Sequence, residues 1–345
     1  MKKCTVAYHK NCIVVDSGAM KLAVATAIGP RIVGCFIGDS KENMFAVLPN
    51  EDAPQTDNGY RFYGGHRLWH SPEDSPLSYE PDNDPVKVEE LESGVEVSGA
   101  ADPKTGMKKK MLIEPLSNGM FCITHTLENC GIWPVEIAPW ALTMMAPGGM
   151  LVIPQGRNPD GFPFAPDRSL KLWAYSNLGD YRLKFTENYI LMANDPKAEK
   201  PCKIGFDDRA GWIAYAVNGQ ALVKYFDVDP DGDYPDDGCT VESYTCNLHT
   251  EVETLGVLET VEPGDCIQHV EYWQPIDGIG KIASEKDVEK KLVPYLLPAD
   301  DCCCDDDCCC EDDCCCEDDC CCDDDCCCEE EEKKPAKKAK KSCKK

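Results

Sequence analysis

The sequence has little positive charge, no long apolar run and almost no helical periodicity. Its 345 residues contain 35 Lys and Arg against 62 Asp and Glu, a net charge of −27, which excludes an ordinary basic nucleic-acid-binding protein. The apolar stretch Leu22–Ile28 is short and is followed by Gly29–Arg31, so it predicts a buried strand rather than a membrane anchor. The basic Met1–Lys3 is followed by the mixed segment Cys4–Lys10 instead of an apolar one. We therefore expect no export signal, no membrane association and a cytoplasmic protein.

The 25 cysteines are unevenly distributed along the chain. Nine lie before Ala299; they include no C-x-x-C pair and are odd in number, which favours reduced thiols over a disulfide framework. From Ala299 the composition becomes almost entirely Cys, Asp, Glu and Lys. We predict a body at 1–298, a tail of cysteine and acidic repeats at 299–332, and a lysine-rich terminus at 333–345. The body is long enough for one large β domain or two smaller ones.

Short alternating runs predict β-strands through nearly all of the body. Lys110–Leu116 and Phe121–Leu127 flank Ser117–Gly119, which is a strong hairpin signal. Ser284–Asp287 forms a capping box and predicts one helix, which Pro294 ends. Many strands and one late helix predict an all-β antiparallel sandwich or barrel.

The most informative run is RFYGGHRLWHSPE at 61–73, within a long polar segment that we interpret as an ordered functional loop. Its paired glycines let the backbone approach a ligand, aromatic rings can stack on a sugar, and the charged side chains and imidazoles offer hydrogen bonds and proton transfer. This combination suits a polyhydroxylated substrate. The alternative is that His66 and His70 cap turns and Arg67 pairs with an acid.

Five motifs cover nearly all of residues 5–277: GPRIVGCF at 29–36, GGHRLWHSPE at 64–73, Glu128–Gly149, Tyr234–Thr245 and Glu251–Trp273. Together they resemble an uncharacterised bacterial family of the galactose-mutarotase-like superfamily. The resemblance implies an antiparallel β-supersandwich with a small-molecule sugar as partner on its concave face. With the short C-terminal helix predicted above, this is the expected fold, and we expect no cofactor in the body. It also implies either acid–base ring opening like that of an aldose 1-epimerase or carbohydrate binding without catalysis.

The resemblance implies a base and substrate contacts. A mutarotase base is a strand Glu followed by Thr and, further on, by a Pro-Gly turn; Glu253 matches this pattern. Glu251 would share its face if the segment is a strand, so the two carboxylates could raise one another's pKa or hold a cation. The residues expected to bind substrate are Arg67, Trp69, Glu73, Trp140, Glu242, Tyr244, Glu251 and His269.

The catalytic acid departs from the family pattern, because Ala138–Trp140 stands where mutarotases place a histidine. We expect His66, His70 or His269 to replace it from another strand or loop; otherwise the fold binds a sugar without turning it over. His125, in an alternating strand, is expected to be a core histidine with its hydrogen bonds satisfied. Lys203 is one of several cations suited to an acidic sugar or phosphate, and its spacing does not single it out.

The tail repeats a cysteine triplet and an acidic triplet every six residues and has no apolar periodicity, so we predict disorder. Thiolates bind Zn(II), Cu(I) or Cd(II), which predicts metal binding; the alternative is a slipped repeat without a role. The lysine-rich end is expected to be solvated rather than to bind nucleic acid. The candidate metal ligands are Cys302, Cys303, Cys304, Cys308, Cys309, Cys310, Cys314, Cys315, Cys316, Cys320, Cys321, Cys322, Cys326, Cys327 and Cys328.

A calcium site is a weaker possibility in the body. Asp227, Asp229 and Asp231 follow the beginning of a calcium-loop pattern. Position 12 of that pattern is Gly238 rather than Glu, which excludes an EF-hand and leaves only a looser site.

Overall fold

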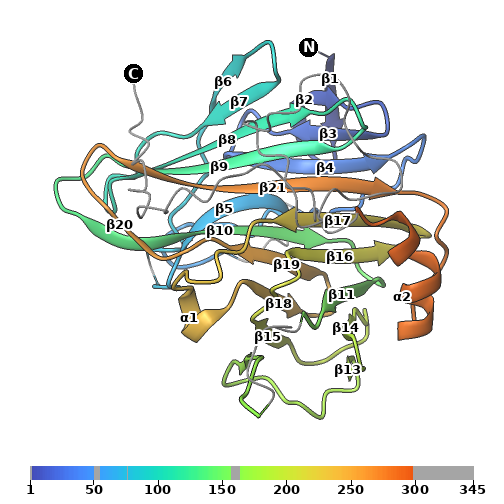
Figure 1. Cartoon of the computed structure of the whole chain (residues 1–345). Helices are drawn as coiled ribbons and strands as arrows, with labels where there is room; N and C mark the ends of the chain where they lie inside the picture. The colour runs from blue at the N-terminus through green and yellow to red at the C-terminus, as the bar shows by residue number, and fades with distance from the viewer. Residues whose placement is uncertain (1, 50–54, 76, 157–163, 298–345) are drawn as a thin grey trace, which may run out of the picture. The chain divides into compact units, whose positions relative to one another are not determined.

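The computed structural model describes residues 2–49, 55–75, 77–156 and 164–297. They form two antiparallel β-sheets (Figure 1). In order of pairing, the first sheet contains β1 (Lys2–Val6), β2 (His9–Asp16), β3 (Met20–Val24), β4 (Arg31–Ile37), β5 (Gly65–Ser71), β10 (Val135–Met145), β19 (Thr250–Leu255), β18 (Val241–Thr245), β15 (Cys202–Phe206) and β12 (Leu170–Leu172), and β20 (Glu259–Val261) also pairs with β10.

The second sheet has ten strands. In order of pairing they are β13 (Leu183–Phe185), β14 (Tyr189–Ala193), β11 (Met150–Pro154), β16 (Trp212–Val217), β17 (Gln220–Phe226), β21 (Cys266–Ile276), β9 (Phe121–Asn129), β8 (Met107–Pro115), β7 (Val95–Ser98) and β6 (Lys87–Glu90). The prediction of an all-β antiparallel fold is confirmed. The predicted hairpin is also present, because β8 pairs with β9 across the turn at 116–120.

The helices are short. The predicted helix is α2 (Glu285–Lys291), and the Ser284 side chain caps it by accepting a hydrogen bond from the Asp287 backbone N–H. A four-residue turn, α1 (Pro235–Gly238), and a 3₁₀ turn at Val293–Tyr295 were not predicted. No helix among the described residues is long and apolar enough to cross a membrane.

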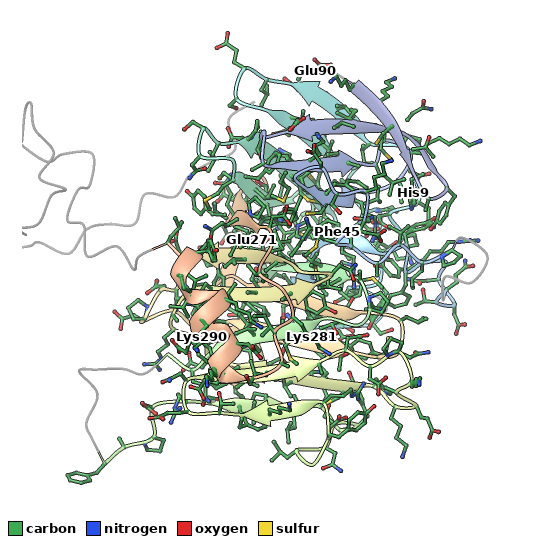
Figure 2. All side chains as sticks on the ribbon, turned by 90° about the vertical axis from the view of Figure 1, so that its right-hand side faces the viewer. His9, Phe45, Glu90, Glu271, Lys281 and Lys290 are labelled. Atoms are coloured by element: carbon green, nitrogen blue, oxygen red, sulfur yellow. The ribbon has the colours of Figure 1, made fainter. Side chains whose placement is uncertain are left out.

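The main hydrophobic core lies between the two sheets. It combines side chains of the first sheet, such as Leu22 and Val252, with side chains of the second, such as Ile123 and Trp273. The Phe45 and Trp273 rings meet edge to face with centroids 5.8 Å apart. Figure 2 shows Phe45 deep in this sandwich. Because side chains alternate along a strand, every residue next to a core residue on the first sheet points to the opposite, outer face.

Eight of the nine body cysteines carry free thiols, whereas Cys266 is disulfide-bonded, so the prediction of reduced thiols is wrong for this one residue. The tail, with its 15 candidate metal ligands and its predicted disorder, lies outside the described residues.

Candidate functional site

The run at 61–73 is mostly a strand, so its interpretation as a loop was wrong. Gly65–Ser71 forms β5, which is buried along its whole length and pairs with β4 and β10. Arg67 lies opposite Leu142 and Trp69 opposite Trp140 on β10. These four side chains share the outer face of the sheet, where they begin the candidate site.

Two glycines allow the backbone at the start of β5 to pack closely against its neighbours. Gly64 has a φ of +94°, and a Cβ there would lie 2.1 Å from the Ala46 carbonyl oxygen. Gly65 has a φ of +70°, and a Cβ there would lie 2.2 Å from the Ile32 carbonyl oxygen. Only glycine fits both the left-handed backbone and the close approach, so the paired glycines serve strand packing.

A cavity of about 450 Å³ opens on the outer face of the first sheet. Trp69 meets Trp140 and Tyr79 with ring centroids 5.4 and 4.8 Å apart. Of the predicted site residues, six line this cavity: Arg67, Trp69, Glu73, Trp140, Tyr244 and Glu251. The combination of aromatic faces with charged and hydroxyl groups fits a ligand that has both apolar faces and hydroxyl groups.

Arg67 and Glu251 form a buried ion pair in the cavity wall. Nη2 of Arg67 lies 2.9 Å from Oε1 of Glu251, and the guanidinium lies over the Trp69 ring at 4.4 Å. Burial favours the neutral acid, but the Arg67 charge and hydrogen bond outweigh it, and the pKa of Glu251 is lowered. Glu251 is therefore an ionised hydrogen-bond acceptor at neutral pH.

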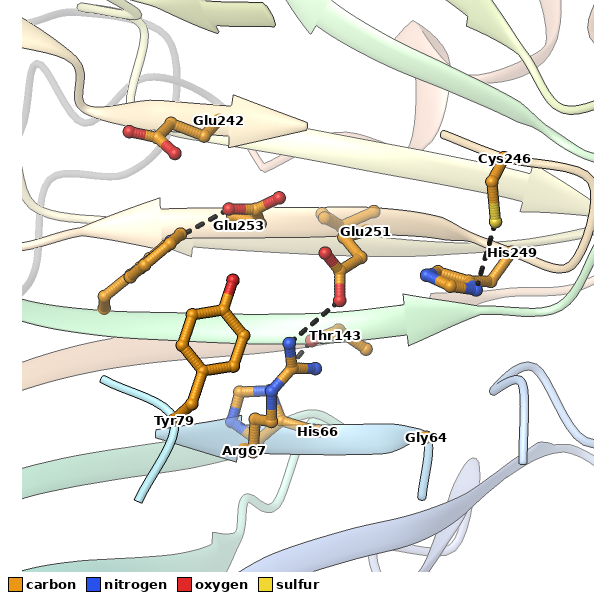
Figure 3. Close-up of polar contacts among 12 residues, drawn as sticks. Gly64, His66, Arg67, Tyr79, Thr143, Glu242, Cys246, His249, Glu251 and Glu253 are labelled. Carbon is orange, nitrogen blue, oxygen red and sulfur yellow. Dashed lines mark hydrogen bonds and ion pairs between the residues drawn. The ribbon is translucent and has the colours of Figure 1, made fainter. Parts of the chain in front are cut away.

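Glu253 and Glu242 lie beside Glu251 on the same face, as Figure 3 shows, but they do not line the cavity. Nε1 of Trp140 donates to Oε2 of Glu253 at 2.9 Å. Nζ of Lys203 lies 3.4 Å from the same oxygen and 2.6 Å from Oε2 of Glu242. Lys203 and Trp140 line the cavity and Glu242 does not, so the expected contact of Glu242 with substrate stays a prediction.

This arrangement shifts the pKa values of both acids upward. Complete burial raises the pKa of Glu253 to about 7, although the Lys203 ammonium opposes the shift. Burial also raises the pKa of Glu242 well above its usual value against the same opposition. Lys203 keeps its charge, with Nζ 4.6 and 4.4 Å from the ring centroids of Trp140 and Trp173. Glu253, Glu242 and Lys203 are therefore three titratable groups that lie together next to the cavity.

The histidines expected to supply the acid do not line the cavity. His66 and His70 alternate with Arg67 and Trp69 along β5, so they point to the opposite face of the sheet. His70 lines a separate, smaller cavity of about 110 Å³. His269 is buried between the sheets, where its Nε2 lies 2.7 Å from Oγ1 of Thr254. The structure therefore contradicts their expected placement.

His66, with His125, belongs to an interior polar cluster centred on Glu271, which Figure 2 labels within the sandwich. Glu271 accepts hydrogen bonds from Lys224 at 2.9 Å, Thr254 at 2.6 Å and Trp273 at 2.7 Å. His125 Nδ1 lies 3.0 Å from the His269 carbonyl, so in the neutral ring this nitrogen is the donor. As expected, His125 is a core histidine with its hydrogen bonds satisfied.

The interior cluster is the one group of the described residues that has metal-ligand character. Ligand atoms of His66, His125 and Glu271 lie within 4.8 Å of one another. The two Nε2 atoms already share a hydrogen bond of 2.7 Å, and the Lys224 ammonium holds Glu271. A cation there would meet a buried positive charge, so the donor set fits a hydrogen-bonded network better than a metal. The Asp227–Asp231 loop contains no comparable group within the described chain.

Several cavity residues were missed from the sequence. Tyr79, Tyr175, Cys246 and His249 line the cavity, as does Lys203, which had not been singled out. His249 lies two residues before Glu251, so the same alternation that joined Glu251 to Glu253 predicts its face. Lys203 reaches the cavity because β15 pairs with β18. No local sequence pattern predicts this pairing.

No family model matches the chain, and no curated protein matches it. Among solved structures, a galactose mutarotase-like protein from Lactobacillus casei ATCC 334 is 8% identical, with a TM-score of 0.51 over 76% of this chain and 99% of the other. The Slr1438 protein from Synechocystis sp. PCC 6803 is 9% identical, with a TM-score of 0.49 over 80% and 99%. The first likeness shows that the chain has the galactose mutarotase-like fold. At this identity it shows the fold alone.

Proposed function

We propose that the protein binds a sugar in the cavity on the outer face of β5, β10 and β19. The observation that carries this proposal is the joint presence of Trp69, Trp140 and Tyr175 with ionised Glu251 and Lys203 around one cavity. Aromatic faces stack on the C–H faces of a sugar ring, while charged groups bond its hydroxyls. The galactose mutarotase-like fold supports the same ligand class.

Ligand-observed NMR on a panel of aldoses and uronic acids tests this proposal. Tyr175 lines the cavity and is 50% exposed, so Tyr175→Ala removes a contact face with little effect on folding. We expect the variant to bind about tenfold more weakly to any sugar whose NMR signals broaden with the wild type. This factor corresponds to the loss of one aromatic contact. Tyr295→Ala is the matched control, because Tyr295 is 54% exposed and lies away from the cavity. Equal affinity in all three proteins, or no broadening by any sugar, would contradict the proposal.

A second candidate function is anomerisation like that of an aldose 1-epimerase, favoured by the pKa of about 7 at Glu253. We propose that Lys203, which lines the cavity, passes one of its own protons to Glu253, 3.4 Å from its Nζ, as it takes up the proton of the anomeric hydroxyl, so that Glu253 is the final acceptor. In exchange NMR, the α and β signals of a bound aldose should exchange faster with the wild type and at the uncatalysed rate with Glu253→Gln. Binding without any acceleration would leave a carbohydrate-binding protein.

Metal binding by the tail is a separate proposal, supported by the 15 regularly spaced cysteines of its sequence. Full-length protein is compared with a variant in which these cysteines are serines. Elemental analysis after exposure to Zn(II), followed by gel filtration, should find bound zinc only in the wild type. Equal zinc in both proteins, or zinc in neither, would remove the proposal.

A further inference from the structure

Cys246 and His249 form a thiol–imidazole pair at the turn between β18 and β19, and both line the cavity. The Cys246 Sγ lies 3.5 Å from Nδ1 of His249 (Figure 3). The Leu248 backbone N–H also donates to this sulfur, at 3.4 Å. Two nitrogen groups therefore face one sulfur, an arrangement that accepts the thiol proton and stabilises developing negative charge on the sulfur.

The other free cysteines differ from Cys246. Four are buried, and Cys130, the exposed one, lies beside the Glu128 carboxylate. Burial and this negative charge raise the pKa of Cys130 and hold it as a thiol. Among the eight free cysteines of the described residues, Cys246 alone lines the cavity and bonds an imidazole.

Arg67, in the wall of the same cavity, has hydrogen-bond donors without a partner among the described residues. The residue is only 2% exposed, and the donors without a partner there are Nε and Nη1. A buried guanidinium with unused N–H groups favours an oxygen atom that carries negative charge. His249 also interacts electrostatically with Arg67 and Glu251, which places thiol, base and cation around one space.

We propose that Cys246 is a nucleophile that adds reversibly to the aldehyde carbon of an open-chain aldose in the cavity. The sulfur forms a bond to C1, and the carbonyl π electrons move to the oxygen near Arg67. The thiol proton passes to Nδ1 of His249, and the proton on Nε2 of the same ring passes to that oxygen. The product is a thiohemiacetal; nothing is oxidised and no group leaves. This inference rests on the proposed sugar-binding function and specifies the ligand form that reacts.

Competition for the thiol tests the proposal on the full-length protein. Iodoacetamide alkylation is followed at each cysteine by peptide-resolved mass spectrometry, alone, with D-glyceraldehyde, or with glycerol. We expect Cys246 to react about tenfold faster than Cys130 despite its lower exposure, because a positioned base speeds proton removal. D-Glyceraldehyde should slow alkylation at Cys246 severalfold. Glycerol, of similar size without a carbonyl group, should leave the rate unchanged.

His249→Gln keeps a polar side chain at the turn and removes the base, so Cys246 in the variant should react no faster than Cys130. The glyceraldehyde comparison uses the wild type and stands even if this variant folds poorly. Equal protection by glyceraldehyde and glycerol, or a Cys246 rate no higher than that of Cys130, would overturn the proposal. If sugar signals broaden in the NMR test while glyceraldehyde does not slow the alkylation of Cys246, the sugar-binding proposal stands and the thiol addition is refuted.

Discussion

Two polar clusters lie on opposite faces of the first sheet, and they differ in how fully their hydrogen bonds are satisfied. Inside the sandwich, Lys224 donates to Glu271 and His66 bonds Thr143 and His125, and every buried polar side-chain atom of Glu271, His66 and Lys224 has a partner. On the outer face, Glu253 and Arg67 keep buried atoms without partners among the described residues.

This difference in hydrogen bonding distinguishes a cluster that stabilises the fold from a cluster that borders a cavity. An unsatisfied buried polar group costs free energy, and a ligand that reaches the group recovers that cost. The saturated interior cluster therefore stabilises the fold and is closed to ligands. The outer cluster borders a cavity, and Arg67 in the cavity wall keeps N–H groups without a partner among the described residues.

The largest effect is expected from breaking the interior cluster. Lys224→Met leaves the Glu271 carboxylate buried without its ammonium partner, 2.9 Å away in the wild type. We expect the free energy of unfolding to fall by about 3–5 kcal/mol in urea titrations. Lys291→Met, which breaks an exposed ion pair with Asp287, should cost less than about 1 kcal/mol. Similar losses in both variants would contradict the distinction.

Acid should also destabilise the interior cluster first. Burial lowers the pKa of His269 from 6.5 to about 3, so the folded state holds this ring neutral. Its stabilising contribution is complete above pH 6.5 and is lost as the pH falls towards 3, because the unfolded chain takes up the proton first. Between pH 7 and pH 4 the urea midpoint of the wild type should fall relative to that of His269→Gln, because both proteins share every other titrating group. A wild-type midpoint that rises in acid relative to that of His269→Gln would refute this assignment.

The outer cluster should respond to pH with the opposite sign. Since burial raises the pKa of Glu253 to about 7, its contribution to stability is complete below pH 4.5 and is lost as the pH rises through 7. Glu253→Gln should therefore gain roughly 1–3 kcal/mol relative to the wild type between pH 4.5 and 7. Glu251→Gln is the matched contrast: because Arg67 lowers the pKa of Glu251, that contribution is complete above pH 4.5, so the difference from the wild type should stay constant between pH 4.5 and 7 and shrink only in stronger acid. Parallel curves for both variants would show that the two acids do not differ.

The smallest effect is expected outside both clusters. Ser284→Ala removes the cap of α2 and should cost about 1 kcal/mol in the free energy of unfolding, with no effect on sugar affinity. Ser284→Asp keeps an N-cap acceptor and should retain the wild-type value. A change in sugar affinity in either variant would show that the cavity responds to stability alone.

Local patterns predicted the fold well. The β8–β9 hairpin and the α2 cap depend on neighbouring residues, and both were readable from the sequence. The cavity was predicted in part: Glu251 lies on its wall, whereas Glu253 lies behind Trp140 and Lys203. Glu253 is covered by side chains from other strands, and no local sequence pattern specifies the register of those strands.

The histidine error had a different cause. Glycines and polar residues made the run at 61–73 look like a loop, in which His66 and Arg67 can face one ligand. As a strand, it must send them to opposite faces. The alternation along Gly65–Ser71 is the sequence signal that places the two side chains on opposite faces.

The central claim is that a sugar occupies the outer cavity and not the interior. The most direct test is a crystal structure of the full chain soaked in the aldose that broadens most strongly in NMR. We predict density for one sugar against Trp69 and Trp140, with a hydroxyl bonded to Glu251 and the Glu271 cluster unchanged. Density at another surface, or an empty cavity at saturating sugar, would contradict the claim.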